Sequence, residues 1–438
     1  MNFMNLLFHL ISKGKKLYLF DARTYSIIEI RNHLSKTLKL LEDNSYRVSK
    51  TKFLKENYEK EWKISLSEME KLISNGFLST CDDEYISAPS LKRLVLMLTD
   101  GCNLACKYCF ERDKPSDLKC HAQMSSKTAV ASLEYLLKNS PYQEVFINLY
   151  GGEPLLNFRT IKSLIEMGEK LSKIYNKQIK WFLVTNGTLI NQKIANFIKD
   201  NKIGVQVSID GSDIKHNIYR TFVDGRQSYD LVKKNIKKLE ALGVCCNLLV
   251  VLTKANVGDL RWLEELKKTA SGKIAFCIAA TDRKEVLPTN GEWEEFISKY
   301  ELFLKNQDYR QNQTIGTLVN RIKKGGKLYF GCGGGLEELT VSPTGEMYLC
   351  ERLDSISKLG ISVFDGVPPN DLWRKIIGHV NSSRCKKCWL KYLCGGGCSH
   401  TFRSYSKLNR SFKWHCKIKQ IEAESAITAI CKDFYHEK

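Results

Sequence analysis

Three cysteines that lie close together in the sequence have the spacing of a metal centre. Cys102, Cys106 and Cys109 form a C-x3-C-x2-C pattern. Three thiolates on one loop can share a four-iron cluster, and a cluster with only three protein ligands keeps one iron open for a small molecule. The alternative is a zinc site, which normally needs a fourth ligand at short range, and only Cys120 and His121 are nearby. The spacing favours iron–sulfur and leaves zinc open.

A second and larger array of cysteines lies beyond residue 331. The spacing is C-x12-G-x4-C and then, after a gap, C-x2-C-x5-C-x3-C-x17-C. Its members are Cys332, Cys350, Cys385, Cys388, Cys394, Cys398 and Cys416. A pair of zinc ribbons built from C-x2-C pieces would account for four of these residues but not for seven. We therefore expect further iron–sulfur centres here.

The composition limits the class of protein that can hold these cysteines. The chain has 438 residues, 16 cysteines and a formal net charge of +20. This length predicts two or three domains, and 43% hydrophobic residues exclude wholesale disorder. No apolar stretch approaches the ~18 residues of a membrane helix, and the first lysines follow the N-terminal apolar run, whereas a secretory signal has the opposite order. We expect a cytoplasmic protein without a membrane partner, where thiols stay reduced and cysteines bind metal rather than form disulfides.

The positive charge is scattered and does not mark a nucleic-acid site. Residues 1–90 contain 14 Lys and Arg against 12 Asp and Glu. Most of the excess lies in residues 91–331, where lysines interrupt apolar residues at helical spacing, as on the solvated faces of amphipathic helices. We expect no nucleic-acid partner.

The elements that must position the first cysteines alternate between strand and helix. Between residues 93 and 280, apolar runs rich in β-branched residues are mostly separated by helical patterns of ten or more residues. The predicted strands are 94–98, 145–150, 181–185, 205–210, 247–253 and 273–279. This alternation is typical of a parallel sheet with crossover helices, open or closed into a barrel, whose ligands lie at the carboxyl ends of the strands.

The C-x3-C-x2-C loop and the ends of the following strands resemble the radical S-adenosylmethionine (SAM) enzymes. Tyr108 fills the aromatic position of the family's cysteine motif, and the strand ends GGEP, TNGT and SIDG follow in the family's order. The resemblance implies an α/β fold with a partial (β/α)6 barrel, a [4Fe-4S] cluster that binds SAM, and an electron donor such as flavodoxin or ferredoxin. It implies metal ligation by the three cysteines. The residues that it places around SAM are Tyr108, Gly151, Gly152, Glu153, Pro154, Asn186, Ser208, Asp210 and Arg220.

Within this resemblance, four of these residues have expected contacts, and one of them, Ser208, corresponds to a residue near the ribose. A carboxylate such as Glu153 can accept hydrogen bonds from the methionyl ammonium group of SAM. Asp210 corresponds to a residue near the ribose, and Arg220 to an arginine that often meets the cofactor carboxylate. The family's chemistry is reductive cleavage of SAM, after which a 5′-deoxyadenosyl radical removes hydrogen from the substrate.

The second cysteine array resembles the SPASM extension of radical SAM enzymes, which holds two auxiliary [4Fe-4S] clusters. The resemblance assigns one cluster to a set of four, Cys385, Cys388, Cys394 and Cys416. It assigns the other to Cys332, Cys350 and Cys398, which leaves either an open iron or a fourth ligand from elsewhere, such as another residue near Cys332. An open iron could bind a substrate thiolate. Six cysteines remain for ordinary packing: Cys81, Cys120, Cys245, Cys246, Cys277 and Cys431.

The N-terminal segment resembles the PqqD-like peptide-recognition element of ribosomal-peptide maturases, a small winged-helix-like module. Strands at 16–20 and 26–30, helices near 31–42, 51–60 and 66–75, and a closing strand at 76–78 are predicted. An exposed strand edge can accept an extended peptide; the alternative is a structural or dimerising appendage. The predicted domains are 1–90 (peptide recognition), 91–290 (radical SAM barrel), 291–331 (helical connector) and 332–438 (cysteine-rich SPASM domain).

Together these resemblances imply an oxidoreductase that modifies a ribosomally made precursor peptide, held by its leader. We favour a thioether from a cysteine sulfur to carbon; carbon–carbon crosslinking and epimerisation are alternatives. An anaerobic sulfatase-maturing type of enzyme is a further alternative, but it has an aspartate base directly after the position of Cys350, where this chain has Glu351. Glu351 is therefore the candidate catalytic base. The non-enzyme alternative is an iron–sulfur regulator that binds DNA through its winged helix.

Overall fold

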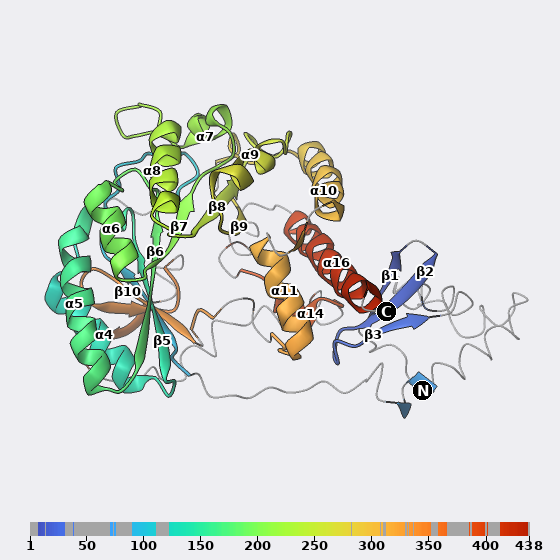
Figure 1. The fold of residues 1–438 in the computed structure, drawn as a ribbon, viewed down its shortest axis with the longest axis horizontal. Helices are drawn as coiled ribbons and strands as arrows, with labels where there is room; N and C mark the ends of the chain where they lie inside the picture. The colour runs from blue at the N-terminus through green and yellow to red at the C-terminus, as the bar shows by residue number, and fades with distance from the viewer. Residues whose placement is uncertain are drawn as a thin grey trace, which may run out of the picture.

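The computed structural model contains a large α/β unit and a small antiparallel sheet near the N-terminus (Figure 1). It describes residues 8–30 without 14, residue 38, residues 71–75 without 73, and 90–110, 122–281, 283–306, 308–309, 312–328, 331, 333–335, 337–351, 358–365, 385, 388–398, 401 and 412–436. In this part of the chain, no helix is long and apolar enough to cross a membrane.

Six parallel strands form the centre of the main sheet. They are β4 (Arg93–Met97), β5 (Glu144–Tyr150), β6 (Gln178–Thr185), β7 (Gly204–Ser208), β8 (Cys246–Leu252) and β9 (Ile274–Ile278). They follow the six predicted apolar runs, and each strand pairs with the next one along the chain. The prediction of an α/β fold with a mostly parallel sheet is therefore confirmed. Because the strands run the same way, their carboxyl ends meet at one edge.

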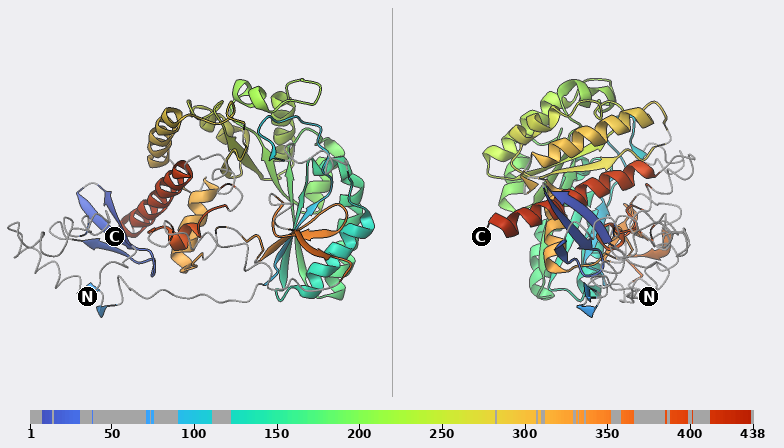
Figure 2. Two further views of the ribbon diagram at one scale, coloured as in Figure 1. Left: turned by 180° about the vertical axis from the view of Figure 1, so that it is seen from behind. Right: turned by 90° about the vertical axis from the view of Figure 1, so that its right-hand side faces the viewer.

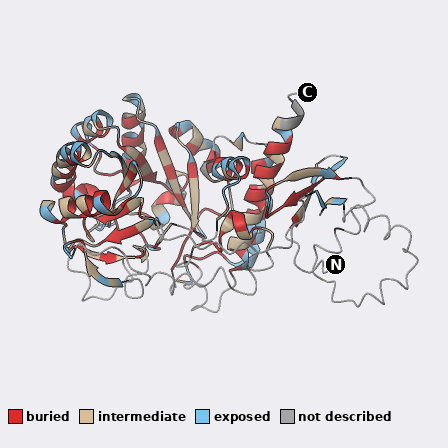
Figure 3. Cartoon of the chain, turned by 90° about the horizontal axis from the view of Figure 1, so that it is seen from below, coloured by how far each residue is buried: buried red, intermediate tan, exposed pale blue. Residues whose placement is uncertain are grey.

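Helices cross over between these strands and cover the outer face of the sheet (Figure 1). They are α4 (Ser126–Asn139), α5 (Phe158–Ile174), α6 (Gln192–Asp200), α8 (Tyr229–Ala241) and α9 (Trp262–Thr269). In α5, apolar residues such as Ile161 and Leu164 are buried, whereas Lys162 and Lys170 are exposed. Figure 3 shows the same division, with buried positions facing the sheet and exposed positions facing outward. Much of the lysine excess is thus the solvated side of crossover helices.

The sheet continues beyond the six predicted strands into the cysteine-rich segment. β10 (Glu338–Val341) pairs in parallel with β4, and β11 (Glu346–Tyr348) and β12 (Lys358–Ser362) add antiparallel strands. The nine strands form an open sheet in the order β12-β11-β10-β4-β5-β6-β7-β8-β9. The sequence did not predict this continuation, because β10 and β11 are short and the pairing of β10 with β4 is not local.

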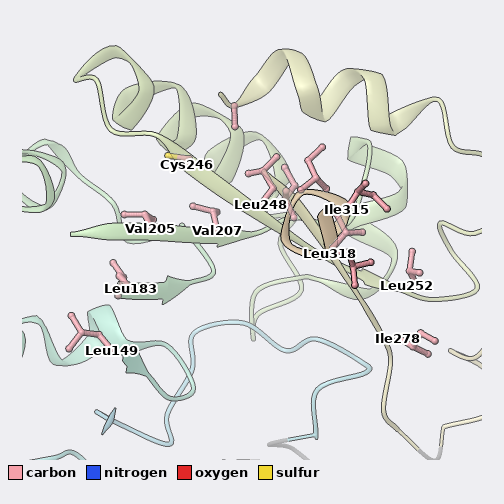
Figure 4. Packing of buried hydrophobic residues seen from close by; sticks show 14 of the residues in the cluster. Leu149, Leu183, Val205, Val207, Cys246, Leu248, Leu252, Ile278, Ile315 and Leu318 are labelled. Carbon is pink, nitrogen blue, oxygen red and sulfur yellow. The ribbon is translucent and has the colours of Figure 1, made fainter. Parts of the chain in front are cut away.

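Helices of the connector and of the C-terminus pack together on the inner side. α10 (Asn290–Lys305) begins with a capping box between Thr289 and Glu292, and α11 (Gln313–Lys324) and the long α16 (Lys413–His436) pack against each other. Ile315 and Leu318 of α11 lie beside Leu248 of β8 in the buried cluster (Figure 4). The predicted helical connector therefore forms part of the core of the main unit.

The N-terminal sheet has three antiparallel strands, β1 (Phe8–Lys13), β2 (Lys16–Asp21) and β3 (Ile27–Ile30). The two predicted strands are present, and β1 is an additional strand. Of the predicted helices, Leu38 and residues 71, 72 and 74 are described and helical. The rest of those helices and the predicted strand at 76–78 lie outside the described residues.

This sheet packs against the C-terminal part of the chain, beside the C-terminal end of α16 (Figures 1 and 2). The His9 ring stacks on Trp389 with centroids 4.0 Å apart, and His9 Nε2 lies 2.9 Å from Glu424 Oε1 of α16. The Tyr25 hydroxyl donates to the carbonyl of Tyr392 at 2.6 Å. Trp389 and Tyr392 lie between Cys388 and Cys394, so the N-terminal sheet contacts the segment that connects these two cysteines.

Candidate active site

A cavity that opens to solvent lies at the carboxyl ends of the parallel strands. Nine of the predicted site residues line it: Cys102, Cys106, Tyr108, Cys109, Gly151, Gly152, Asn186, Ser208 and Arg220. Leu249, Val251, Ile278, Ala279 and Ala280 form an apolar part of the lining. Segments that lie far apart in the sequence therefore meet around one space.

The loop that carries the first three cysteines follows β4 and is held by backbone contacts. Ala105 N–H donates to the carbonyl of Thr221 at 2.7 Å, and Lys107 N–H donates to that of Tyr219 at 3.0 Å. Burial raises the pKa of Cys102 to about 12 and that of Cys106 to about 11. Buried thiols of this kind ionise readily only when a cation or metal centre compensates the charge.

The donor set fits a cluster that is held by three cysteines. Three thiols and an arginine line the same cavity, and a small molecule has room beside them. Among the described residues, no three His, Cys, Asp or Glu side chains form a group that could hold a single metal ion.

Two glycines at the end of β5 allow the strand to press against the cysteine loop. Gly151 has φ +136°, and a Cβ on it would lie 2.2 Å from the carbonyl oxygen of Thr99. A Cβ on Gly152 would lie 2.3 Å from the carbonyl oxygen of Gly101. Glu153 N–H also donates to this Gly101 oxygen at 2.9 Å. A larger residue at 152 would displace the chain directly before Cys102.

The Glu153 carboxylate faces the end of β6 rather than the cavity. It is fully buried and accepts hydrogen bonds from Leu155 N–H at 3.1 Å, Thr185 Oγ1 at 2.7 Å and Asn186 N–H at 2.7 Å. Burial raises the pKa of Glu153 to about 7. Pro154 begins the short 3-10 helix η4 (Pro154–Asn157) and is likewise absent from the cavity lining. In this structure Glu153 positions the β6 end, and its expected contact with a ligand ammonium stays a prediction.

Asn186 links the end of β6 to the cysteine loop. Its Nδ2 donates to Asn103 Oδ1 at 2.9 Å and lies 3.7 Å from Cys102 Sγ, while its Oδ1 accepts from Thr188 N–H at 2.9 Å. Asn103 in turn donates to Thr188 Oγ1 at 2.8 Å. The sequence did not single out Asn103, because asparagine in a loop carries no motif signal.

Asp210 holds two cavity residues in place without lining the cavity itself. Its carboxylate accepts from the Tyr108 hydroxyl, from Arg220 Nε at 3.2 Å and from Val251 N–H at 3.0 Å. Asp210 and Arg220 are only 3% and 6% exposed. Arg220 follows α7 (Asp213–Tyr219), and its guanidinium lies over the Tyr108 ring. The expected position of Asp210 near a ligand ribose stays a prediction.

A buried histidine supports this arrangement and was not predicted. His216 Nδ1 accepts from Asp210 N–H at 3.2 Å, and Nε2 lies 2.9 Å from Ser228 Oγ, which donates to the carbonyl of Arg220 at 2.7 Å. Burial lowers the pKa of His216 to about 3. The neutral ring therefore joins the strand end to the chain at Arg220.

Four cysteines of the second array interact in pairs: Cys385 with Cys388, and Cys394 with Cys388 and with Cys416. Burial raises the pKa of Cys394 to about 12; the positive charge of Lys419 opposes this shift, and the thiols of Cys388 and Cys416 contribute to it. Cys388 is close enough to Cys385 for a similar effect. Cys394 ends the short helix α14 (Lys391–Cys394), and Cys416 lies in the first turn of α16. These are the four residues that were predicted as one ligand set.

The other predicted set is described only in part. Cys332 lies outside the described residues. Gly331 and Gly397, the sequence neighbours of Cys332 and Cys398, are in backbone contact, since a Cβ on Gly331 would lie 1.8 Å from the Gly397 oxygen. The Cys350 thiol donates to Glu351 Oε2 at 3.5 Å.

Glu351, the candidate base, does not line the cavity around Cys102. Its charge instead acts on Glu338, whose pKa is raised chiefly by burial and further by Glu351.

Two of the cysteines that were assigned to packing are not buried in the core. Cys245 is exposed, and Cys277 lines the cavity at the end of β9. Cys246 and Cys431 are buried as expected. Cys81 and Cys120 lie outside the described residues, as does His121. The sequence around Cys277 is apolar and did not indicate that this residue lines the cavity. Strand residues near a carboxyl end can face either the core or the site.

Comparison with known proteins finds a matching family model and related sequences. A family model for the radical SAM superfamily matches residues 96–266. The uncharacterized protein MJ0907 of Methanocaldococcus jannaschii is 32% identical over 280 residues, which cover 62% of this chain and 88% of that protein. The cysteine-type anaerobic sulfatase-maturating enzyme of Clostridium perfringens is 25% identical over 358 residues, which cover 75% of this chain and 94% of the relative.

A solved structure shares the fold. Native anSMEcpe with bound AdoMet and Cp18Cys peptide superimposes with a TM-score of 0.67 at 21% identity, covering 80% of this chain and 100% of that one. The remaining fifth of this chain has no counterpart in that structure.

Proposed function

The chain belongs to the radical SAM superfamily, and from this premise we propose that it is a maturase that modifies a ribosomally made precursor peptide. The observation that carries the proposal is the single cavity in which three cysteines meet two glycines, Asn186, Ser208 and Arg220. Relatives include anaerobic sulfatase-maturating enzymes and a radical SAM cyclopropyl synthase. The proposed domains are 1–90, 91–290, 291–331 and 332–438.

Cys102, Cys106 and Cys109 would hold the first [4Fe-4S] cluster, with SAM beside it. When bound, these groups supply reductive cleavage of SAM and hydrogen abstraction from the substrate. The backbone of Gly151 and Gly152 would lie against the methionyl end of SAM, because neither residue has a side chain to fill that space.

Arg220 would provide the positive charge for the SAM carboxylate. Asp210 fixes the guanidinium through Nε at 3.2 Å, and a bidentate group held in this way retains its other N–H donors for an anion. The apolar wall formed by Leu249, Val251 and Ile278 would exclude water from the reacting atoms.

The seven cysteines of the second array would hold two auxiliary clusters in a SPASM domain. The pairwise interactions of Cys394 with Cys388 and Cys416, and of Cys388 with Cys385, support the first of these. The second would use Cys332, Cys350 and Cys398. A flavodoxin or ferredoxin would supply electrons, and Glu351 remains the candidate base for a substrate near Cys350.

Residues 1–90 would bind the leader of the precursor as a PqqD-like element. β3 has β2 on one side and no other described strand on the second side, so its second edge can accept an extended peptide. The near-equal counts of basic and acidic residues in this segment do not suit phosphate binding. Contacts of His9 and Tyr25 hold the sheet beside the cysteine-bearing segment.

We favour a thioether product because a three-cysteine auxiliary cluster could bind a substrate thiolate. Carbon–carbon crosslinking and epimerisation use the same scaffold. A sulfatase-maturating activity is a second candidate, favoured by the 25% identity to the Clostridium perfringens enzyme over 75% of this chain. It would oxidise a cysteine or serine in a sulfatase peptide and would need no leader.

Anaerobic reconstitution with iron, sulfide, dithionite, SAM and the peptide encoded beside the gene tests these proposals. We expect 5′-deoxyadenosine and a peptide that has lost two hydrogens; unchanged mass with deuterium uptake from solvent would indicate epimerisation instead. Cys109→Ala should abolish both products, whereas Cys245→Ala, which changes an exposed cysteine, should not. Absence of 5′-deoxyadenosine with the wild-type protein would refute the proposed reaction. Turnover of a sulfatase peptide in preference to the precursor would favour the second candidate.

The leader site has a separate test. A leader peptide that carries a photoreactive residue should crosslink to residues 27–30. Crosslinks confined to the main α/β unit would refute the proposed recognition role.

A further inference from the structure

His415 has a buried ring nitrogen without a partner. Among the described residues its Nε2 has no hydrogen-bond partner and almost no solvent exposure. The ring stacks on Phe412, with centroids 4.5 Å apart and an interplanar angle of 29°. Nearly all buried polar atoms in native proteins have a partner, because a buried polar atom without one destabilises the folded state. We therefore expect this nitrogen to bind a ligand.

The nitrogen is directed at the chain next to Cys398. A Cβ on Gly397 would lie 2.8 Å from His415 Nε2, so the ring occupies the space that a side chain at 397 would fill. Gly397 has φ +77°, which favours glycine. The same Gly397 contacts Gly331 through its backbone. Three segments thus meet here, and each carries a cysteine of the second array directly after the contacting residue.

The cluster assigned to Cys398 is the one that lacks a fourth ligand. The neighbouring set already has four cysteines, including Cys416, which directly follows His415 in α16. Imidazole is a suitable ligand for iron, and in some iron–sulfur centres histidine replaces cysteine. We propose that His415 binds, through Nε2, the fourth iron of the auxiliary cluster that includes Cys350 and Cys398. This proposal rests on the proposed auxiliary clusters and gives the three-cysteine cluster a complete protein ligand set, so a substrate thiolate would reach its iron only by displacing His415.

The full-length chain, grown with natural or 15N-labelled histidine and freed of any affinity tag, provides the test. It is reconstituted anaerobically with iron and sulfide alone, reduced with dithionite and measured by pulsed electron paramagnetic resonance. SAM is omitted because its amino nitrogen would also couple to a cluster. We expect a nitrogen coupling strong enough for direct ligation, which changes from the 14N to the 15N pattern with labelled histidine.

Variants then identify the residue and the cluster. The coupling should vanish in His415→Ala and in His415→Cys, and the cysteine variant should retain the iron content of the wild type. It should also vanish in Cys398→Ala but persist in Cys385→Ala, which affects the neighbouring cluster. The labelling experiment needs no variant and therefore holds even if a substitution prevents folding.

Different results would refute ligation by His415 and the presence of the auxiliary clusters. About twelve irons per chain without a histidine coupling would overturn ligation by His415 and leave the auxiliary clusters in place. A weak coupling, typical of an N–H group that donates to a cluster sulfur, would overturn it as well. Only about four irons per chain would overturn the auxiliary clusters and His415 ligation together.

Discussion

Replacing Gly152 by alanine tests how strongly the reaction depends on the position of the cysteine loop, because this change leaves the three thiols of the loop intact. The new Cβ would lie 2.3 Å from the Gly101 oxygen, 2.6 Å from the Gly101 carbon and 2.8 Å from the Asp100 oxygen. These are backbone atoms that no rotamer change can move aside. Ordinary contact begins at 3.4 Å, so the chain directly before Cys102 must shift by about 1.1 Å (3.4 − 2.3).

The effect of this shift on the rate follows from the positions that it disturbs. The same Gly101 oxygen accepts the Glu153 N–H at 2.9 Å, and a shift of this size breaks that bond. Misplacement of reacting groups by about 1 Å lowers rates by roughly 100-fold. Forcing extra volume into a packed site costs about 1–3 kcal/mol. We therefore expect Gly152→Ala to form 5′-deoxyadenosine about 100 times more slowly.

The assay compares reconstituted variants under single-turnover conditions, with iron content measured in parallel. Gly291→Ala is the matched control, because a Cβ there meets nothing within 4 Å and Gly291 is exposed in the first turn of α10. The control should cleave SAM at the wild-type rate. A wild-type rate in Gly152→Ala would refute the steric argument, since the loop would then tolerate the displacement.

Three further predictions concern buried contacts. Arg220→Met should destabilise the metal-free protein by about 3–5 kcal/mol in chemical denaturation, because it leaves the Asp210 carboxylate buried without its cation, and adding Asp210→Asn should recover part of this loss. Between about pH 5 and 7, Glu153 and the buried His216 should change the stability of the metal-free protein in opposite directions. Burial raises the pKa of Glu153 from 4.5 to about 7, so loss of its proton lowers the stability of the folded state as the pH rises, whereas His216, whose pKa burial lowers to about 3, raises that stability; Glu153→Gln should therefore shift the slope of melting temperature against pH in the positive direction. Tyr25→Phe removes the bond to the Tyr392 carbonyl, worth about 1 kcal/mol, and should speed hydrogen exchange in β1–β3 about fivefold.

Each of these predictions has a contrary outcome. Strictly additive losses from Arg220→Met and Asp210→Asn would show that the two side chains do not interact. The same slope of stability against pH between 5 and 7 in the wild type and in Glu153→Gln would contradict a protonated Glu153. Unchanged exchange in Tyr25→Phe would mean that other contacts alone hold the N-terminal sheet.

The six central strands could be predicted because strands buried on both faces form continuous apolar runs, such as residues 247–253. Cavity residues that follow these strands could be placed for the same reason, as for Gly151 and Ser208. The directions of the Glu153 and Asp210 carboxylates could not be predicted, since they depend on donors from β6, β8 and the cysteine loop. Side-chain direction at a strand end is decided by partners that are distant in the sequence.

Short elements and long-range contacts escaped prediction for a related reason. β10 has only four residues, and its partner β4 precedes it by more than two hundred. His9 gives no local sign that it stacks on Trp389. Contacts of this kind are determined by the packing of whole units.

The pairing of β10 with β4 also imposes an order on biosynthesis. Arg93 and Glu338, which face each other in this pair, are 245 residues apart. At a translation rate of roughly 5–20 residues per second, β10 leaves the ribosome about 12–50 s after β4. The edge of β4 stays unpaired during this interval. Unpaired edges of this kind attract other chains. Recombinant yield should therefore depend on translation speed and chaperone supply during this interval, and a chain truncated before residue 338 should aggregate even though its six central strands are complete.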